Sequence, residues 1–178
     1  GPDSFTYTLS DGRGGTATAT VALTIAAVND APVLGAIGNR TVDELTTLSF
    51  TAVATDVDAG QTRSFSLDAA ALALGATIDA ATGQFSWTPT EAQGAGVYAI
   101  TITVTDNGTP ALNDSETIQV TVSEVNQAPV LNAIGNQTAN EGQLLTFVIG
   151  GSDADLPANT LTFSASGLPT GATFDPTT

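Results

Sequence analysis

The feature that most constrains the fold of this chain is an internal repeat. The segment Ala31–Asn39 recurs almost unchanged as Ala128–Asn136, so that Pro32 and Pro129 stand 97 positions apart. A repeat of this length matches the size of a small domain. The sequence therefore predicts an array of similar domains joined end to end.

The repeat also predicts where each domain begins and ends. Residues 31–127 would form one complete domain, and residues 128–178 would form the front of the next. Residues 1–30 match the end of a domain, because Ser4–Gly12 parallels Ala99–Asn107. Since the chain has no initiator methionine or signal peptide, we expect it to be an excerpt or a processed product.

Strict alternation of apolar and polar residues predicts β-strands. Between Tyr98 and Val104 every second residue is large and apolar, with alanine or threonine between. Period two with one apolar face is typical of antiparallel strands over a core. Many short strands separated by turn clusters predict an all-β fold with sandwiches of about seven antiparallel strands. Asp68–Leu74 has a helical composition, which we interpret as a loop or a single turn.

Charge and composition exclude several functions. Eighteen acidic and three basic residues give a net charge of −15, which opposes binding to nucleic acid and to anionic lipid. No apolar run is long enough to cross a membrane, so we predict no membrane insertion. The chain lacks histidine, cysteine and lysine, which removes the usual catalytic bases and nucleophiles. We therefore predict no enzyme and no catalytic residues, and we interpret Trp87 as a core residue.

The acidic residues gather at strand ends, and several recur with the repeat. The repeated pairs are Glu44 and Glu141, Asp56 and Asp153, and Asp58 and Asp155. Asp106, at the end of a neighbouring strand, would bring a further carboxylate to the same pole. Like charges this close favour a bound cation, and calcium accepts about six to eight oxygen ligands. The alternative is that these residues are solvated aspartates of Asx-turns.

The chain resembles a known group of repeats. Thr105–Pro129 resembles the last two strands and linker of a cadherin repeat, and Ala54–Asp58 resembles the Asp-x-Asp calcium pair of that family. Gly75–Asp79 followed by Thr82–Pro89 is similar to the cadherin-like (dystroglycan-type) and putative Ig tandem repeats of large bacterial surface proteins and adhesins. The resemblance implies tandem Ig-like or cadherin-like β-sandwiches.

The resemblance also implies calcium between consecutive domains, with ligands contributed from both sides. At the first junction the implied ligands are Asn29, Asp30, Asp56, Asp58 and Asp106. At the second junction they are Glu44, Glu91, Glu124, Asn126, Asp153 and Asp155. The linkers are one residue shorter than the cadherin form, and Gln127 replaces the acidic residue found at Asp30. The second site is therefore expected to be weaker or to hold fewer ions.

The predicted function is that of a calcium-stiffened spacer or fibre module in a secreted or surface-anchored, bacterial protein. Its partners would be neighbouring repeats or identical chains, with a cell-surface or matrix ligand as a further partner. One alternative is a self-assembling filament in which residues 1–30 of one chain complete the sandwich begun by residues 128–178 of the next. Another alternative is a carbohydrate-binding or spacer module of a secreted enzyme, which would need an exposed aromatic platform.

Overall fold

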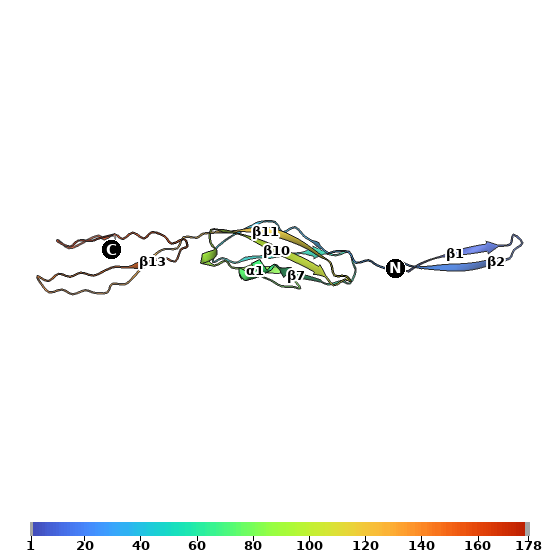
Figure 1. The fold of residues 1–178 in the computed structure, drawn as a ribbon, viewed down its shortest axis with the longest axis horizontal. Helices are drawn as coiled ribbons and strands as arrows, with labels where there is room; N and C mark the ends of the chain where they lie inside the picture. Colours follow the sequence, from blue (N-terminus) through green and yellow to red (C-terminus); the bar gives the residue numbers. More distant parts are fainter. Residues whose placement is uncertain (1, 177–178) are drawn as a thin grey trace.

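The computed structural model describes residues 2–176. A hairpin lies at one end of the long axis, a sandwich lies in the middle, and a more open segment lies at the other end (Figure 1). The end residues Gly1, Thr177 and Thr178, which belong to the two segments paired in the strand-complementation hypothesis, fall outside the described residues. None of the helices in residues 2–176 is long and apolar enough to cross a membrane.

The N-terminal hairpin consists of β1 (Pro2–Ser10) and β2 (Thr16–Thr24), which pair antiparallel. Its turn is closed by Asp11, whose Oδ1 accepts the backbone N–H groups of Arg13 and Gly15, both at 2.8 Å. These two hydrogen bonds favour the charged form, so they lower the pKa of Asp11. All of β1 is exposed along both faces.

The central sandwich contains the longest strands of the chain. Its main sheet has the order β4-β11-β10-β7. The strands of this sheet are β4 (Arg40–Asp43), β7 (Arg63–Leu67), β10 (Gly96–Asp106) and β11 (Asn113–Ser123). The sequence predicted antiparallel strands, and β10 does pair antiparallel with both β11 and β7. β4, in contrast, runs parallel to β11.

The opposing strands are short. The order β5-β9-β8 forms one small sheet, and β3 pairs with β6. The bounds are β3 (Val33–Leu34), β5 (Leu48–Thr51), β6 (Ala54–Thr55), β8 (Thr77–Ile78) and β9 (Gln84–Trp87). Counted with the two-residue strands, the sandwich has more strands than the seven expected.

The core is formed by the alternating apolar residues of the central strands. The fully buried members are Ile100, Ile102 and Val104 of β10, Ile118, Val120 and Val122 of β11, and Phe85 and Trp87 of β9. Phe50 stacks on Phe85 with the ring centroids 4.6 Å apart. Trp87 is 1% exposed, and its indole N–H donates to the Leu74 carbonyl at 3.0 Å. The prediction that Trp87 is a core residue is confirmed.

A short helix lies where a loop or single turn was predicted. α1 (Ala69–Ala73) begins after Asp68, whose side chain accepts the Ala71 N–H at 2.7 Å. That N-terminal cap and the alanine-rich sequence stabilise slightly more than one turn. The helix packs the side chain of Ala71 into the core.

The 3-10 helix η1 (Glu91–Gln93) follows β9. Thr90 and Gln93 form a capping box around it, which fixes the backbone that carries Glu91.

The C-terminal segment repeats the first pairing of the sandwich. β12 (Val130–Leu131) pairs antiparallel with β13 (Gly151–Ser152), and Val130 lies opposite Ser152. In the sandwich Val33 lies opposite Thr55, which is the same pair 97 positions earlier. The apolar residues of this segment are largely exposed, as Leu144 and Phe147 illustrate.

Candidate metal centre

Three glutamates meet at the end of the sandwich that faces the C-terminal segment. Glu44 follows β4, Glu91 lies in η1, and Glu124 follows β11. One carboxylate oxygen from each lies within 4.8 Å of the others. We call these residues the glutamate cluster. Residues far apart in sequence are thus brought together by the sheet, as predicted for the second junction.

The glutamate cluster contains buried oxygens without hydrogen-bond partners. Glu44 is 2% exposed, and its Oε1 accepts the Val125 N–H at 3.1 Å. Its Oε2 and the Oε2 of Glu124 are buried with no partner. A buried, unsatisfied carboxylate oxygen is costly, and a divalent cation would satisfy both.

The raised pKa of Glu124 also favours a bound cation at the glutamate cluster. Burial raises the pKa of Glu124, and the charges of Glu44 and Glu91 raise it further. Asp155 of the following segment also contributes to this increase. A neutralising cation would reverse these effects, because it favours the charged form of each carboxylate.

A glycine makes room for the cluster. A Cβ added at Gly94 would overlap Oε2 of Glu44 and would lie 2.8 Å from Oε2 of Glu124. Its φ of −61° is accessible to any residue. Glycine is therefore needed at this position because a side chain would occupy the space of the two carboxylates, and not because the backbone conformation is unusual.

The C-terminal segment contributes aspartates to the second junction. Asp155 is 2% exposed and accepts the Gln127 N–H at 2.9 Å and the Asn159 side-chain amide at 2.7 Å. Asp153 accepts the N–H of Asp155 at 3.0 Å. Asn126, in contrast, donates its side-chain amide to the Gln127 carbonyl rather than to the glutamate cluster.

The first junction gathers its predicted residues around Asn29. The Asn29 amide donates to Oδ2 of Asp106 at 3.0 Å and to the Pro110 carbonyl at 2.9 Å. The Gln61 side-chain amide donates to Oδ1 of Asn29 at 2.5 Å. The backbone N–H of Asp30 donates to Oδ2 of Asp58 at 2.8 Å. The linker is therefore held against the sandwich by polar contacts.

Two buried oxygens at the first junction also lack partners. They are Oδ2 of Asp56 and Oε1 of Gln61. Asp106 is 5% exposed. Burial raises its pKa, but hydrogen bonds from the Leu112 N–H, the Asn29 side chain and the Gly108 N–H lower the pKa below its usual value. Asp106 is thus held in its charged form.

Both hypotheses for the repeated aspartates find support in the geometry. Asp56 accepts the Asp58 N–H at 2.9 Å, and Asp153 makes the equivalent bond, which are the contacts of Asx-turns. These bonds use one oxygen of Asp56, and the other oxygen stays buried without a partner. Turn formation and cation binding are therefore compatible here.

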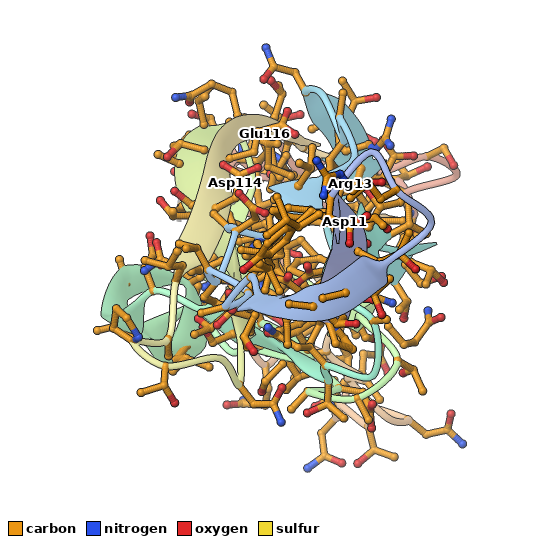
Figure 2. All side chains as sticks on the ribbon, turned by 90° about the vertical axis from the view of Figure 1, so that its right-hand side faces the viewer. Asp11, Arg13, Asp114 and Glu116 are labelled. Atoms are coloured by element: carbon orange, nitrogen blue, oxygen red, sulfur yellow. The ribbon has the colours of Figure 1, made fainter. Side chains whose placement is uncertain are left out.

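Other carboxylates are already satisfied by the backbone. Figure 2, viewed along the long axis, shows Asp114 and Glu116 on the β11 ribbon, with Asp11 and Arg13 on the hairpin. Glu116 accepts the N–H groups of Ile37 and Gly38 at 2.7 and 2.9 Å. Asp114 accepts the Leu34 N–H at 2.8 Å. These hydrogen bonds hold the backbone of residues 34–38 against β11 and occupy the carboxylate oxygens that a cation would need.

Several residues of the two junctions were missed from the sequence. They are Gln61, Gly94 and Asn159, together with the side chain of Gln127. Gln61 and Asn159 have no counterpart at the same offset in the other repeat, so the repeat gave no signal for them. Glycine next to the Glu91 turn was visible in the sequence, but its proximity to Glu44 depends on the fold.

Comparisons with known proteins agree with this architecture. The family model described as "Putative Ig domain" matches residues 31–123 and 128–178, and the model described as "Bacterial Ig domain" matches residues 1–24. No curated protein sequence matches the chain.

Solved structures of cadherin repeats are similar in fold. Mouse Cadherin-23 EC22-24 has a TM-score of 0.56 and 22% identity, over 73% of this chain and 45% of that chain. Human CDH23 EC21-23 has a TM-score of 0.58 and 18% identity, over 86% and 54%. The protocadherin gammaB7 EC3-6 cis-dimer structure gives 0.53 and 21%, over 86% and 43%. The chain thus spans about half of each of these structures, and the predicted resemblance and all-β fold class are confirmed.

Proposed function

The chain belongs to the family of Putative Ig domains, and we propose from that premise that it is a calcium-stiffened spacer or fibre segment of a longer protein. Its units would be residues 1–30, 31–127 and 128–178. Calcium would be held at the second junction by residues of both units that meet there. The neighbouring repeats would then behave as one rod.

The observation that carries this proposal is the pair of buried, unpartnered oxygens on Glu44 and Glu124. Glu91 lies close enough to contribute a third oxygen. An all-oxygen set of this kind suits calcium, which tolerates irregular geometry and carboxylate ligands. Magnesium is less suitable because it requires near-ideal octahedral geometry and gives up water reluctantly.

The remaining ligands would come from the next unit. The charge of Asp155 helps to raise the pKa of Glu124, and Asp155 is itself buried. Asp153, two residues before it, would complete the set. A cation bound by residues of both units restrains the hinge between them. At millimolar calcium, extracellular modules with millimolar to submillimolar dissociation constants gain about 1 kcal/mol per site.

The first junction would work in the same way with Asn29, Asp30, Asp56, Asp58 and Asp106. We propose that the second site is the weaker of the two or holds fewer ions, because Gln127 stands where the first linker has Asp30.

Calcium at these concentrations is found outside cells, so we propose an extracellular or cell-surface location. The match of residues 1–24 to the Bacterial Ig domain model supports a bacterial source. The partners would be neighbouring repeats of the same protein, together with a cell-surface or matrix ligand. We propose a non-catalytic role, because the chain lacks the side chains that most often serve as bases and nucleophiles.

Thermal melts of the chain in calcium and in EDTA test the proposal. We expect the melting temperature to rise when calcium is added, because a cation that binds only the folded junction stabilises it. The double variant Glu44→Gln with Glu124→Gln should lose this response while keeping its β-sheet circular dichroism. Identical melting temperatures of the wild-type chain in calcium and in EDTA would contradict the proposal.

A second candidate is end-to-end assembly of identical chains. Phe5 of β1 is 54% exposed, whereas Ile100, its counterpart in the sandwich, is fully buried. A segment like residues 128–176 of another copy would cover this face by strand addition. Sedimentation velocity at increasing concentration tests the candidate, and a monomer throughout would rule it out. The buried Trp87 leaves the carbohydrate-binding alternative without the aromatic platform it needs at that residue.

A further inference from the structure

The two linkers make one identical contact and differ in another. Asp30 and Gln127 occupy equivalent positions, 97 residues apart. The backbone N–H of Asp30 donates to Asp58 at 2.8 Å, and the backbone N–H of Gln127 donates to Asp155 at 2.9 Å. The main chain of each linker is therefore held by the following unit in the same way. The side chains at this position are different in kind.

The Gln127 side chain reaches back to the preceding sandwich. Its Nε2 donates to Oε2 of Glu91 at 2.9 Å. The other oxygen of Glu91, Oε1, accepts the backbone N–H of Leu156 at 3.1 Å, and Leu156 belongs to the C-terminal segment. Glu91 thus contacts the linker with one oxygen and the next unit with the other.

These contacts connect three parts of the chain without a cation. Gln127 is half-buried and bonds to Asp155 through its main chain and to Glu91 through its side chain. A carboxylate at the same position could not donate to Glu91 and would add a negative charge beside the glutamate cluster. Asp30 therefore could not make the equivalent bond.

We propose that Gln127 is a positioning residue that holds the second junction extended before any cation binds. The side-chain amide partly replaces a cation at this junction, because its N–H hydrogens carry a partial positive charge and one of them bonds to Glu91. The two units at the second junction are then aligned before a cation binds, whereas units joined by a linker with an acidic residue at this position need the cation for their alignment. The inference rests on the proposed function in one respect, namely that the extended arrangement is also the one that calcium would stabilise.

Distances across the junction in EDTA test this proposal. The chain contains no cysteine, so spin labels can be attached at Thr121→Cys in β11 and Asn140→Cys in the C-terminal segment. Both positions are exposed. Double electron–electron resonance then reports how widely the second unit moves relative to the sandwich.

Two substitutions separate loss of the donor from added charge. Gln127→Ala removes the donor alone, and Gln127→Glu removes it and adds a charge. In EDTA we expect a narrow distance distribution for the unsubstituted linker. In both variants the extended population should fall about tenfold relative to bent forms, the usual value of a hydrogen bond to a charged group. Gln137→Ala is the matched control, since its side-chain amide bonds to the Ile134 carbonyl within the C-terminal segment, and it should leave the distribution narrow.

A Gln127→Ala distribution as narrow as that of the unsubstituted linker in EDTA would overturn the proposal. A broad distribution for the unsubstituted linker itself would do so as well. The melting temperature of each variant, followed by circular dichroism, shows that the sandwich remains folded. Calcium titration of the same samples tests the proposed function separately, because the comparison in EDTA contains no cation. A chain that binds no calcium would end the proposed function and leave the EDTA comparison to decide the role of Gln127.

Discussion

The backbone N–H of Val125 donates to Oε1 of Glu44 at 3.1 Å, while Oε2 of the same carboxylate is buried without a partner. One oxygen of Glu44 therefore orients the start of the linker. The other is directed toward the space beside Gly94 that Glu124 shares.

This division predicts the effect of Glu44→Gln. The amide keeps an oxygen for Val125 but removes one negative charge from the glutamate cluster. We expect calcium affinity at the second junction to fall at least about tenfold, equivalent to about 1.4 kcal/mol. Isothermal titration calorimetry measures the change. Asp43→Asn removes the same charge from an exposed neighbour and should leave the affinity nearly unchanged; an equal loss in both variants would mean that net charge alone attracts the ion.

Gly94→Ala is predicted to weaken the same site by a steric route. The added methyl group would displace the Glu44 carboxylate, since the backbone at Gly94 already suits alanine. Calcium affinity should fall while the core stays intact. Gly15→Ala is the matched control, because its Cβ would instead lie 2.5 Å from Oδ2 of Asp11 in the hairpin turn, outside both junctions. Unchanged calorimetry for Gly94→Ala would show that the cation does not occupy this space.

The raised pKa of Glu124 predicts a pH dependence in the absence of calcium. A carboxyl whose pKa is higher in the folded state binds its proton more tightly there, so its contribution to stability is full below the usual glutamate pKa. That contribution is lost as the pH rises through the raised value. In EDTA, Glu124→Gln should therefore become more stable relative to the wild-type chain as the pH increases from 4 toward 7.

Thermal melts at several pH values check this difference, and calcium should reverse it, because the cation favours the charged form of Glu124. Glu141→Gln carries the same charge change at an exposed position and should show no such trend. A stability difference for Glu124→Gln that is constant with pH would contradict the assignment of the raised pKa to the folded junction.

Equivalent positions in the hairpin and in the sandwich should respond differently to truncation. Ile102 is fully buried, whereas Tyr7, its counterpart in β1, is 56% exposed. Ile102→Ala should cost about 2–5 kcal/mol of the unfolding free energy of the sandwich. Tyr7→Ala should change it by no more than about 0.5 kcal/mol. Urea denaturation followed by Trp87 fluorescence measures both, and a large loss for Tyr7→Ala would indicate that another copy covers the hairpin in solution.

The strands and the core could be predicted because their signal is local. The alternation in Tyr98–Val104 correctly predicted that one face of β10 lies in the core. The alternation of Phe85 and Trp87 on their own strand correctly predicted the same for Trp87. The pairing of β4 with β11 was not predicted to be parallel, because alternation defines faces and carries no information about strand direction.

The candidate site was predictable as a set of ligands but not as a geometry. The repeat identified the aspartate pairs, and the family resemblance added Glu91 and Glu124. The burial of Glu44, the space at Gly94 and the contact between Gln127 and Glu91 depend on three separate loops meeting in space. Asn126 was predicted as a ligand, yet its side chain turns toward its own linker. Spacing along the chain contains no information about such contacts.

The parallel register of β4 with β11 has a consequence for a chain under tension. Arg40 lies beside Val120 and Asp43 beside Ser123, and the flanking segments of the chain lie at opposite ends of the sandwich (Figure 1). A pull on both linkers would slide β4 along β11, so that the hydrogen bonds between them are loaded together instead of being unzipped in turn. We expect the sandwich to yield at a high, sharply defined force in single-molecule pulling, and Val42→Pro, which removes a backbone N–H from β4, to lower that force.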